Sequence, residues 1–130
     1  MTAIKTNKPL NTSKNQGAAA EALACRYLQE QGWEVIARNF RSNFGEIDLI
    51  IKQGQWLAFV EVKQRKSDRF GSAAAMVTTQ KQQKIMLTSQ YFLQAHRQYQ
   101  SFHLRYDVLA IDTGSGSPQI TWLTNAFYAQ

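Results

Sequence analysis

Two consecutive segments rich in aliphatic residues, 45–53 and 56–62, constrain the fold of this chain more than any other feature. Only Gly54 and Gln55 separate them, and a Gly-X pair is typical of a two-residue hairpin turn of type II′. We therefore predict an antiparallel β-hairpin. Counting back from the turn pairs Gln53 with Trp56, Ile50 with Phe59, Asp48 with Glu61 and Glu46 with Lys63.

This register places two carboxylates, those of Asp48 and Glu61, opposite each other on one face of the hairpin. Directly opposed side chains have Cβ atoms roughly 4.5–5.5 Å apart, so like charges there repel each other. Aliphatic neighbours indicate strands that are covered on both faces, where an unpaired charge is costly. A divalent cation would turn the repulsion into coordination. The alternative is a cluster of solvated charges at the edge of a sheet.

The composition fits one globular domain. The chain has 130 residues, 44% of them hydrophobic, and its single cysteine excludes an internal disulfide framework. No apolar segment approaches the roughly 20 residues of a membrane-spanning helix, and the N-terminus has no apolar signal segment. We expect a cytoplasmic protein with no membrane partner, in which residues 16–130 form a single domain and residues 1–15 are a flexible basic arm or an inert tail.

The formal net charge of +6 favours a polyanionic partner, and nucleic acid is the commonest one. A polar basic loop follows the charged end of the hairpin, and a later helix carries lysines in its first turns, where cations oppose the helix dipole unless an anion is bound. The residues predicted to contact nucleic acid are Arg65, Lys66, Arg69, Lys81, Gln82 and Lys84. A solvated surface, or an acidic protein partner, would account for the same charges.

Residue periodicity predicts the elements around the hairpin. They are a helix over 17–31 that ends at Gly32, a strand over 33–39, a long helix from a capping box at Thr79 and Gln82 to about Tyr99, and strands over 104–112 and 119–124. The helix and strand order predicts an α/β fold with a mixed central sheet flanked by helices. Glu21 lies at the edge of the apolar stripe of the first helix, either as a surface charge or as a third acid near the hairpin.

An acid followed some dozen residues later by Glu-X-Lys on a strand is the arrangement of a metal-dependent phosphodiesterase centre. Strand alternation sends Glu61 and Lys63 to the same face. We predict that Asp48, Glu61 and the backbone carbonyl of Val62 hold Mg²⁺, with Mn²⁺ as an alternative. Lys63 would polarise the attacking water and stabilise developing charge, and Glu21 would orient a water molecule or help to hold a second ion.

Several segments carry a likeness to known proteins: GAAAEALACRYL, NFRSNFGEIDLI, FVEVKQR, VTTQKQQKI, RYDVLAI and NAF, in order from Gly17 to Phe127. With these the chain resembles the PD-(D/E)XK nuclease superfamily. It is more closely similar to the YraN-like family of uncharacterised bacterial proteins, which resemble archaeal Holliday-junction resolvases. One departure is Ile47, which stands where the superfamily name has proline.

The resemblance implies a restriction-endonuclease-like αβββαβ core, a nuclease-type site and DNA as the polymer. We therefore expect a metal-dependent endonuclease acting on DNA, with branched or structured DNA as the candidate substrate. The alternative is a non-catalytic DNA-binding accessory protein that retains the nuclease fold. A resolvase acting on a two-fold symmetric junction would be a homodimer.

Overall fold

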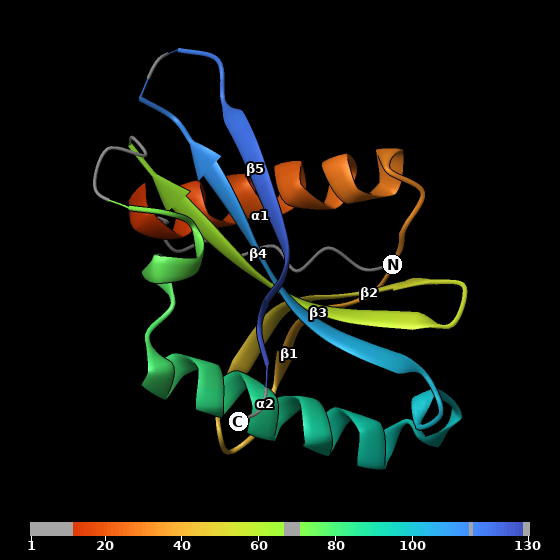
Figure 1. Ribbon diagram of the computed structural model, residues 1–130. Helices are drawn as coiled ribbons and strands as arrows, with labels where there is room; N and C mark the ends of the chain where they lie inside the picture. Colours follow the sequence, from red (N-terminus) through yellow and green to blue (C-terminus); the bar gives the residue numbers. More distant parts are fainter. Residues whose placement is uncertain (1–11, 67–70, 115, 129–130) are drawn as a thin grey trace, which may run out of the picture.

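In the computed structural model, which describes residues 12–66, 71–114 and 116–128, two α-helices lie on opposite sides of a five-stranded mixed sheet (Figure 1). The elements are α1 (Thr12–Glu30), β1 (Glu34–Arg41), β2 (Glu46–Gln53), β3 (Trp56–Arg65), α2 (Thr79–Ala95), β4 (His103–Asp112) and β5 (Gln119–Phe127), with short 3₁₀ turns at Ala74–Met76 and Arg97–Tyr99. The predicted α/β fold with a mixed sheet is confirmed. None of the helices in the described ranges is long and apolar enough to cross a membrane.

The strands lie in the sheet in their chain order, β1-β2-β3-β4-β5. Neighbouring strands are antiparallel except for β3 and β4, which are parallel. A parallel pair needs a crossover connection, and α2 supplies it. This connection brings α2 across the sheet beside β2 and β3, the strands of the predicted hairpin.

Each face of the sheet has its own apolar cluster. The cluster under α1 includes Ala24, Leu28, Leu49, Val60 and Leu109. The cluster under α2 includes Ile50, Phe59, Ile85, Phe92 and Val108. Strands β2, β3 and β4 therefore contribute side chains to both clusters, which explains why their sequences are nearly continuous apolar runs.

The hairpin turn and the first part of its register agree with the prediction. Gly54 has a φ of 58° and Gln55 does not have a positive φ, as a type II′ turn requires. Gln53 pairs with Trp56 and Ile50 with Phe59, and the ladder continues to Leu49 and Val60.

Beyond that point the ladder differs from the prediction. Neither Asp48 and Glu61 nor Glu46 and Lys63 are ladder partners. Instead, the Val62 N–H donates to the Asp48 carboxylate, and Glu46 pairs with Arg41 of β1. The Val62 N–H therefore bonds to a side chain of β2 in place of a backbone carbonyl, and the β2–β3 ladder ends where the charged residues begin.

Several element ends also differ. Helix α1 begins at Thr12, ahead of the predicted start at Gly17, and residues 1–11 of the predicted arm lie outside the described residues. Gly32 ends it as predicted, with a φ of 91° and the backbone hydrogen bonds of a Schellman motif. The N-cap of α2 is Thr78, not Thr79, because the Thr78 side chain accepts from the Lys81 N–H. Helix α2 ends at Ala95, since His96 leaves the helical conformation, and β5 continues to Phe127.

A buried ionic cluster fixes the sheet where β4 meets β5. Asp107 is fully buried and accepts hydrogen bonds from the Arg105 guanidinium, the Trp122 indole N–H at 3.0 Å and the Asn125 backbone N–H at 2.8 Å. The Arg105 guanidinium lies over Trp33, 4.7 Å from the ring centroid. The β4–β5 register shifts beside Asp107, between Tyr106 and Val108. This carboxylate therefore satisfies polar groups that the irregular pairing would otherwise leave buried without partners.

Candidate active site

The structure brings Asp48 and Glu61 together where the β2–β3 ladder ends. The Val62 N–H donates to Asp48 Oδ2 at 2.8 Å, which fixes the orientation of that carboxylate. Glu61 is only 5% exposed. Burial, and after it the charge of Glu61, raises the pKa of Asp48 to about 7, although the Val62 hydrogen bond acts in the opposite direction. The two carboxylates therefore interact strongly, as the sequence predicted, although they are not backbone partners.

Two lysines face the same oxygen of Glu61. The Lys63 Nζ lies 3.7 Å and the Lys81 Nζ 3.8 Å from Glu61 Oε2. Lys63 reaches the site along β3, whereas Lys81 comes from the first turn of α2. Both ammonium groups remain partly exposed, so they can meet a ligand from solvent while they balance the buried charge. The sequence predicted Lys81 only as a nucleic-acid contact, and the structure places it at the carboxylates.

The other oxygen of Glu61 gives the strongest indication that this site binds a cation. Glu61 Oε1 is buried and, when Asp48 is ionised, has no hydrogen-bond donor within the described part of the chain. A buried acceptor without a partner is costly, and native structures contain few of them. A cation beside Asp48 and Glu61 would satisfy this oxygen.

The donor set suits Mg²⁺. Carboxylate and backbone carbonyl oxygens are the ligands of hard cations, and Mg²⁺ is often held by one or two carboxylates while it keeps several waters. Within residues 12–66, 71–114 and 116–128, no three His, Cys, Asp or Glu side chains gather closely enough to hold an ion. The carboxylate ligands would be the Asp48 and Glu61 pair, with the predicted Val62 carbonyl beside them.

Glu21 is close to this pair but approaches it from the other side of the sheet. It belongs to α1, whereas Lys81 belongs to α2. Burial raises the pKa of Glu21, a hydrogen bond with the Asn39 side chain lowers it, and the charge of Asp48 raises it further. The charge of Asp48 therefore affects the pKa of Glu21, but Glu21 does not form a three-carboxylate cluster with Asp48 and Glu61 among the described residues.

Asn39 was missed by the sequence reasoning. It has a φ of 52°, and it lies between two β1 residues that pair with β2, Arg38 with Leu49 and Phe40 with Ile47. Asn tolerates the left-handed conformation better than most residues, which is the signal that the sequence offered. The irregular backbone at Asn39 faces the position of Asp48 on β2, so both strands beside the site depart from regular pairing.

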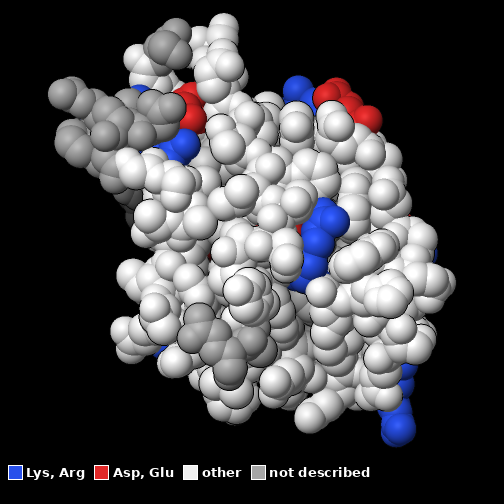
Figure 2. Space-filling model, viewed as in Figure 1, with Lys and Arg blue, Asp and Glu red and all other residues white. Residues whose placement is uncertain are grey.

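The other predicted nucleic-acid residues are dispersed. Lys66 and Lys84 are exposed, and Lys84 lies beside the Gly45 backbone. Arg65 is paired with Asp112 and donates to the Gly71 carbonyl, while Arg69 lies outside the described residues. On the face viewed in Figure 2, wide uncharged surface separates the Lys and Arg side chains. The net positive charge is therefore not gathered into one basic band on this face.

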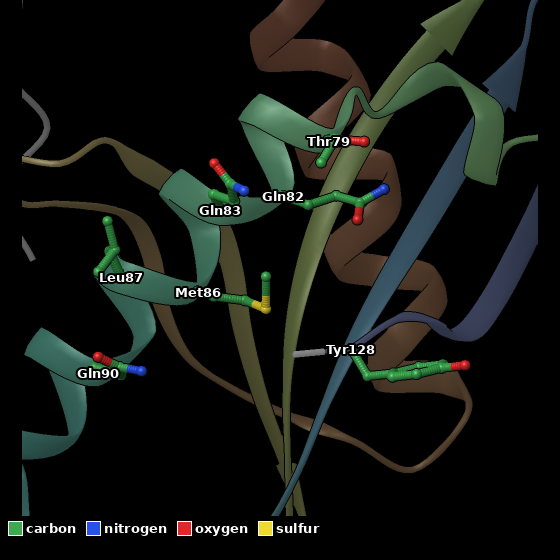
Figure 3. A pocket seen from close by; sticks show the side chains of 7 residues that line it. All are labelled: Thr79, Gln82, Gln83, Met86, Leu87, Gln90 and Tyr128. Atoms are coloured by element: carbon green, nitrogen blue, oxygen red, sulfur yellow. The ribbon is translucent and has the colours of Figure 1, made fainter. Parts of the chain in front are cut away.

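Gln82 has a structural role at the start of α2. Its Nε2 donates to the Val77 carbonyl at 3.0 Å, which satisfies a backbone acceptor next to the helix N-cap. The same side chain lines a groove of about 360 Å³ between α2 and the residue that follows β5, with Met86, Leu87 and Tyr128 among its neighbours (Figure 3). The described residues that line this groove carry no charged side chain, in contrast to the carboxylate site.

The raised pKa of Asp48 predicts how the metal-free protein responds to pH. An unfolded aspartate has a pKa near 3.9, so between about pH 4 and pH 7 the folded state holds a proton that the unfolded state has lost. This contribution to stability is fully present below about pH 4, declines as the pH rises from 4 and is lost as the pH passes through about 7. Asn cannot ionise, so we expect Asp48→Asn to be more stable than the parent at pH 8. Its free energy of unfolding should be roughly 2–3 kcal/mol higher.

Urea unfolding in EDTA at pH 5 and pH 8 measures this difference. The difference in free energy of unfolding between Asp48→Asn and the parent should be smaller at pH 5 than at pH 8. A gap that is equal at the two pH values, or that widens at pH 5, would show that Asp48 is not the buried acid described above.

The chain matches a known protein family over most of its length. A model of the uncharacterised protein family UPF0102 matches residues 20–111 of the chain. The chain belongs to this family. The expected membership in the YraN-like family is thereby confirmed, and the matched UPF0102 region contains Glu21, Asp48, Glu61, Lys63 and Lys81.

Similar UPF0102 proteins match over nearly their whole length. The chain is 47% identical to one from Methylobacillus flagellatus over 116 residues, which cover 89% of this chain and 99% of the relative. It is 49% identical to one from Saccharophagus degradans over 111 residues, covering 85% and 91%. It is 40% identical to one from Legionella pneumophila over 117 residues, covering 90% and 98%. All three relatives are UPF0102 proteins.

Proposed function

We propose that this UPF0102 protein is a divalent-cation-dependent endonuclease that hydrolyses phosphodiester bonds in DNA. The observation that carries the proposal is the Glu61 carboxylate, which is buried beside Asp48 and faces two lysines with one oxygen. Its other oxygen, when Asp48 is ionised, has no hydrogen-bond donor in the described residues. The resemblance of the Asp48 and Glu61-X-Lys63 pattern to the PD-(D/E)XK nucleases supports the same reaction.

Asp48 and Glu61 would hold the cation, with the Val62 carbonyl as a further ligand. A divalent ion bound there supplies positive charge for the scissile phosphate, the nucleophile and the leaving oxygen. The Val62 N–H keeps Asp48 Oδ2 in a fixed orientation, so the carboxylate is positioned before any ligand arrives.

Lys63 and Lys81 provide fixed positive charge at the same place. Each ammonium group can donate to a non-bridging phosphate oxygen, and Lys63 can also orient the attacking water. Since both are already held near Glu61, little reorganisation is needed as negative charge develops on the phosphate. The phosphate would therefore lie between β3 and the first turn of α2.

The direct test is cleavage of four-way junction, flap, single-stranded and linear duplex DNA by the purified protein. We expect strand scission with Mg²⁺ or Mn²⁺ that stops on addition of EDTA, with branched DNA cleaved faster than linear duplex. Failure to cut any of these DNAs with either ion would contradict the proposal.

A second function is favoured by the two ion pairs of Glu61. Lysines that neutralise a buried carboxylate could serve a non-catalytic protein that retains the fold and binds DNA through its remaining cations. In that case DNA would bind with strong salt dependence, no ion would support cleavage, and Asp48→Ala would leave binding unchanged.

A further inference from the structure

We propose that the cavity between the β1–β2 turn and α2 binds an unpaired nucleobase of a DNA strand whose phosphates follow α2 to the carboxylate site. This rests on the proposed function and specifies its substrate. The cavity has a volume of about 420 Å³, within the range of small-ligand pockets, and is lined by Arg41, Ser42, Asn43, Phe44 and Tyr91.

Two aromatic rings line this cavity from different elements. Phe44 in the β1–β2 turn is 50% exposed and Tyr91 of α2 is 49% exposed. The Tyr91 ring lies against Phe40, with ring centroids 6.1 Å apart, and Phe40 packs edge-on against Phe92 in the core. The Tyr91 ring thus packs on Phe40 and remains partly exposed to solvent. Exposed aromatic rings of this kind are the stacking platforms of single-strand-binding proteins, and they accept any base.

The turn that carries Phe44 is held in place. The Ser42 N–H donates to the Gly45 carbonyl at 2.8 Å, and the Phe44 N–H donates to Ser42 Oγ at 3.0 Å. Ser42 Oγ also forms a hydrogen bond of 3.0 Å with Oγ1 of Thr88, which is fully buried in α2. The turn is therefore fastened to α2, and a base entering the cavity would meet a largely preformed wall.

The lysines of α2 lie between this cavity and the candidate active site. Lys81, Lys84 and Tyr91 lie on one side of the helix at helical spacings, and Thr88 in the same row is buried under the β1–β2 turn, so a strand would cross over the turn between Lys84 and Tyr91. Lys81 lies at Glu61, Lys84 lies beside Gly45, and Tyr91 lines the cavity. The row spans about 15 Å along the helix axis, a length that a few nucleotides can cover. Its two lysines would meet the phosphates.

Charge and geometry together favour an unpaired base. Arg41 lines the cavity, but Glu46 pairs with it at 2.9 Å, so stacking would supply more of the affinity than charge. Bases of an intact duplex remain stacked on one another and cannot enter. Single strands, flaps and open junctions present free bases, so the cavity would favour these forms over linear duplex.

Fluorescence anisotropy in EDTA tests this without requiring cleavage. The probes are a labelled single-stranded oligonucleotide and a blunt duplex of the same sequence. We expect Phe44→Ala and Tyr91→Ala each to weaken single-strand binding about tenfold and duplex binding less than about twofold. Tyr91→Phe, which keeps the ring, should bind like the parent. Leu87→Ala, an exposed apolar residue in the other groove on α2, is the matched control and should change neither affinity.

The outcomes separate this inference from the proposed function. Selective loss of single-strand binding in the alanine variants supports the base site even if no DNA is ever cleaved. Equal loss on both probes, no loss on either, or a parent that binds no single strand overturns the base site, even if the protein proves to be a nuclease. Unchanged thermal unfolding midpoints would show that the variants are folded.

Discussion

Replacing Glu61 with glutamine is expected to lower metal-dependent DNA cleavage at least about 100-fold, a loss typical of removing one electrostatic group from a catalytic centre. Glutamine has nearly the same shape, so packing around this 5% exposed side chain should be kept while the charge is lost. The variant would lose a ligand for the cation and the group that holds Lys63 and Lys81. Initial cleavage rates with Mg²⁺ or Mn²⁺ measure the effect.

Lys63→Met is a second variant of the candidate site, and Glu30→Gln is the control. Lys63→Met keeps an apolar stem and removes the ammonium group, so we expect a similar loss of cleavage rate while the cation still binds. Glu30→Gln changes a carboxylate to an amide at the exposed end of α1 and should cleave within about twofold of the parent. Cleavage by Glu61→Gln at the parental rate would show that these carboxylates are not the active site.

Asp107→Asn is expected to destabilise the fold by about 3–5 kcal/mol, the usual cost of removing one partner of a buried ion pair. The substitution would leave the Arg105 guanidinium buried without its counter-ion and would weaken the bonds from the Trp122 indole and the Asn125 N–H. Guanidinium chloride unfolding followed by tryptophan fluorescence measures the change, because Trp122 reports directly on the cluster.

Glu30→Gln is again the matched control and should lie within about 0.5 kcal/mol of the parent. A loss below about 1 kcal/mol in Asp107→Asn would mean that the cluster of Arg105, Asp107 and the tryptophans contributes little to stability. Such a result would also show that the shifted β4–β5 register is held by other contacts.

The fold could be predicted from the sequence because its local signals agree. Gly32 ends α1 and Gly54 begins the hairpin turn, and both have the positive φ that favours glycine. The apolar runs of β2 and β3 match strands that are covered on both faces. The predicted element ends are wrong where tertiary contacts, and not local sequence, determine them. The sequence favours Thr79 as the N-cap because Gln82 follows three residues later, but the Lys81 N–H donates to Thr78 and the Gln82 side chain donates to the Val77 carbonyl.

The sequence predicted part of the arrangement of the candidate site. Strand alternation correctly placed Glu61 and Lys63 on one face, since Lys63 contacts Glu61. Uniform counting from the turn could not anticipate that the Asp48 side chain would take the Val62 N–H and end the ladder. The approach of Lys81 depends on how α2 crosses the sheet, which no local pattern encodes.

Binding of Mn²⁺ to the metal-free protein, followed by electron paramagnetic resonance or calorimetry, tests the metal centre most directly. The parent and Glu30→Gln should bind the ion saturably with equal affinity. Asp48→Asn and Glu61→Gln should each lose at least about tenfold in affinity, because each removes a charged oxygen ligand. A parent that binds no Mn²⁺, or variants that bind it as the parent does, would contradict a metal site at these carboxylates.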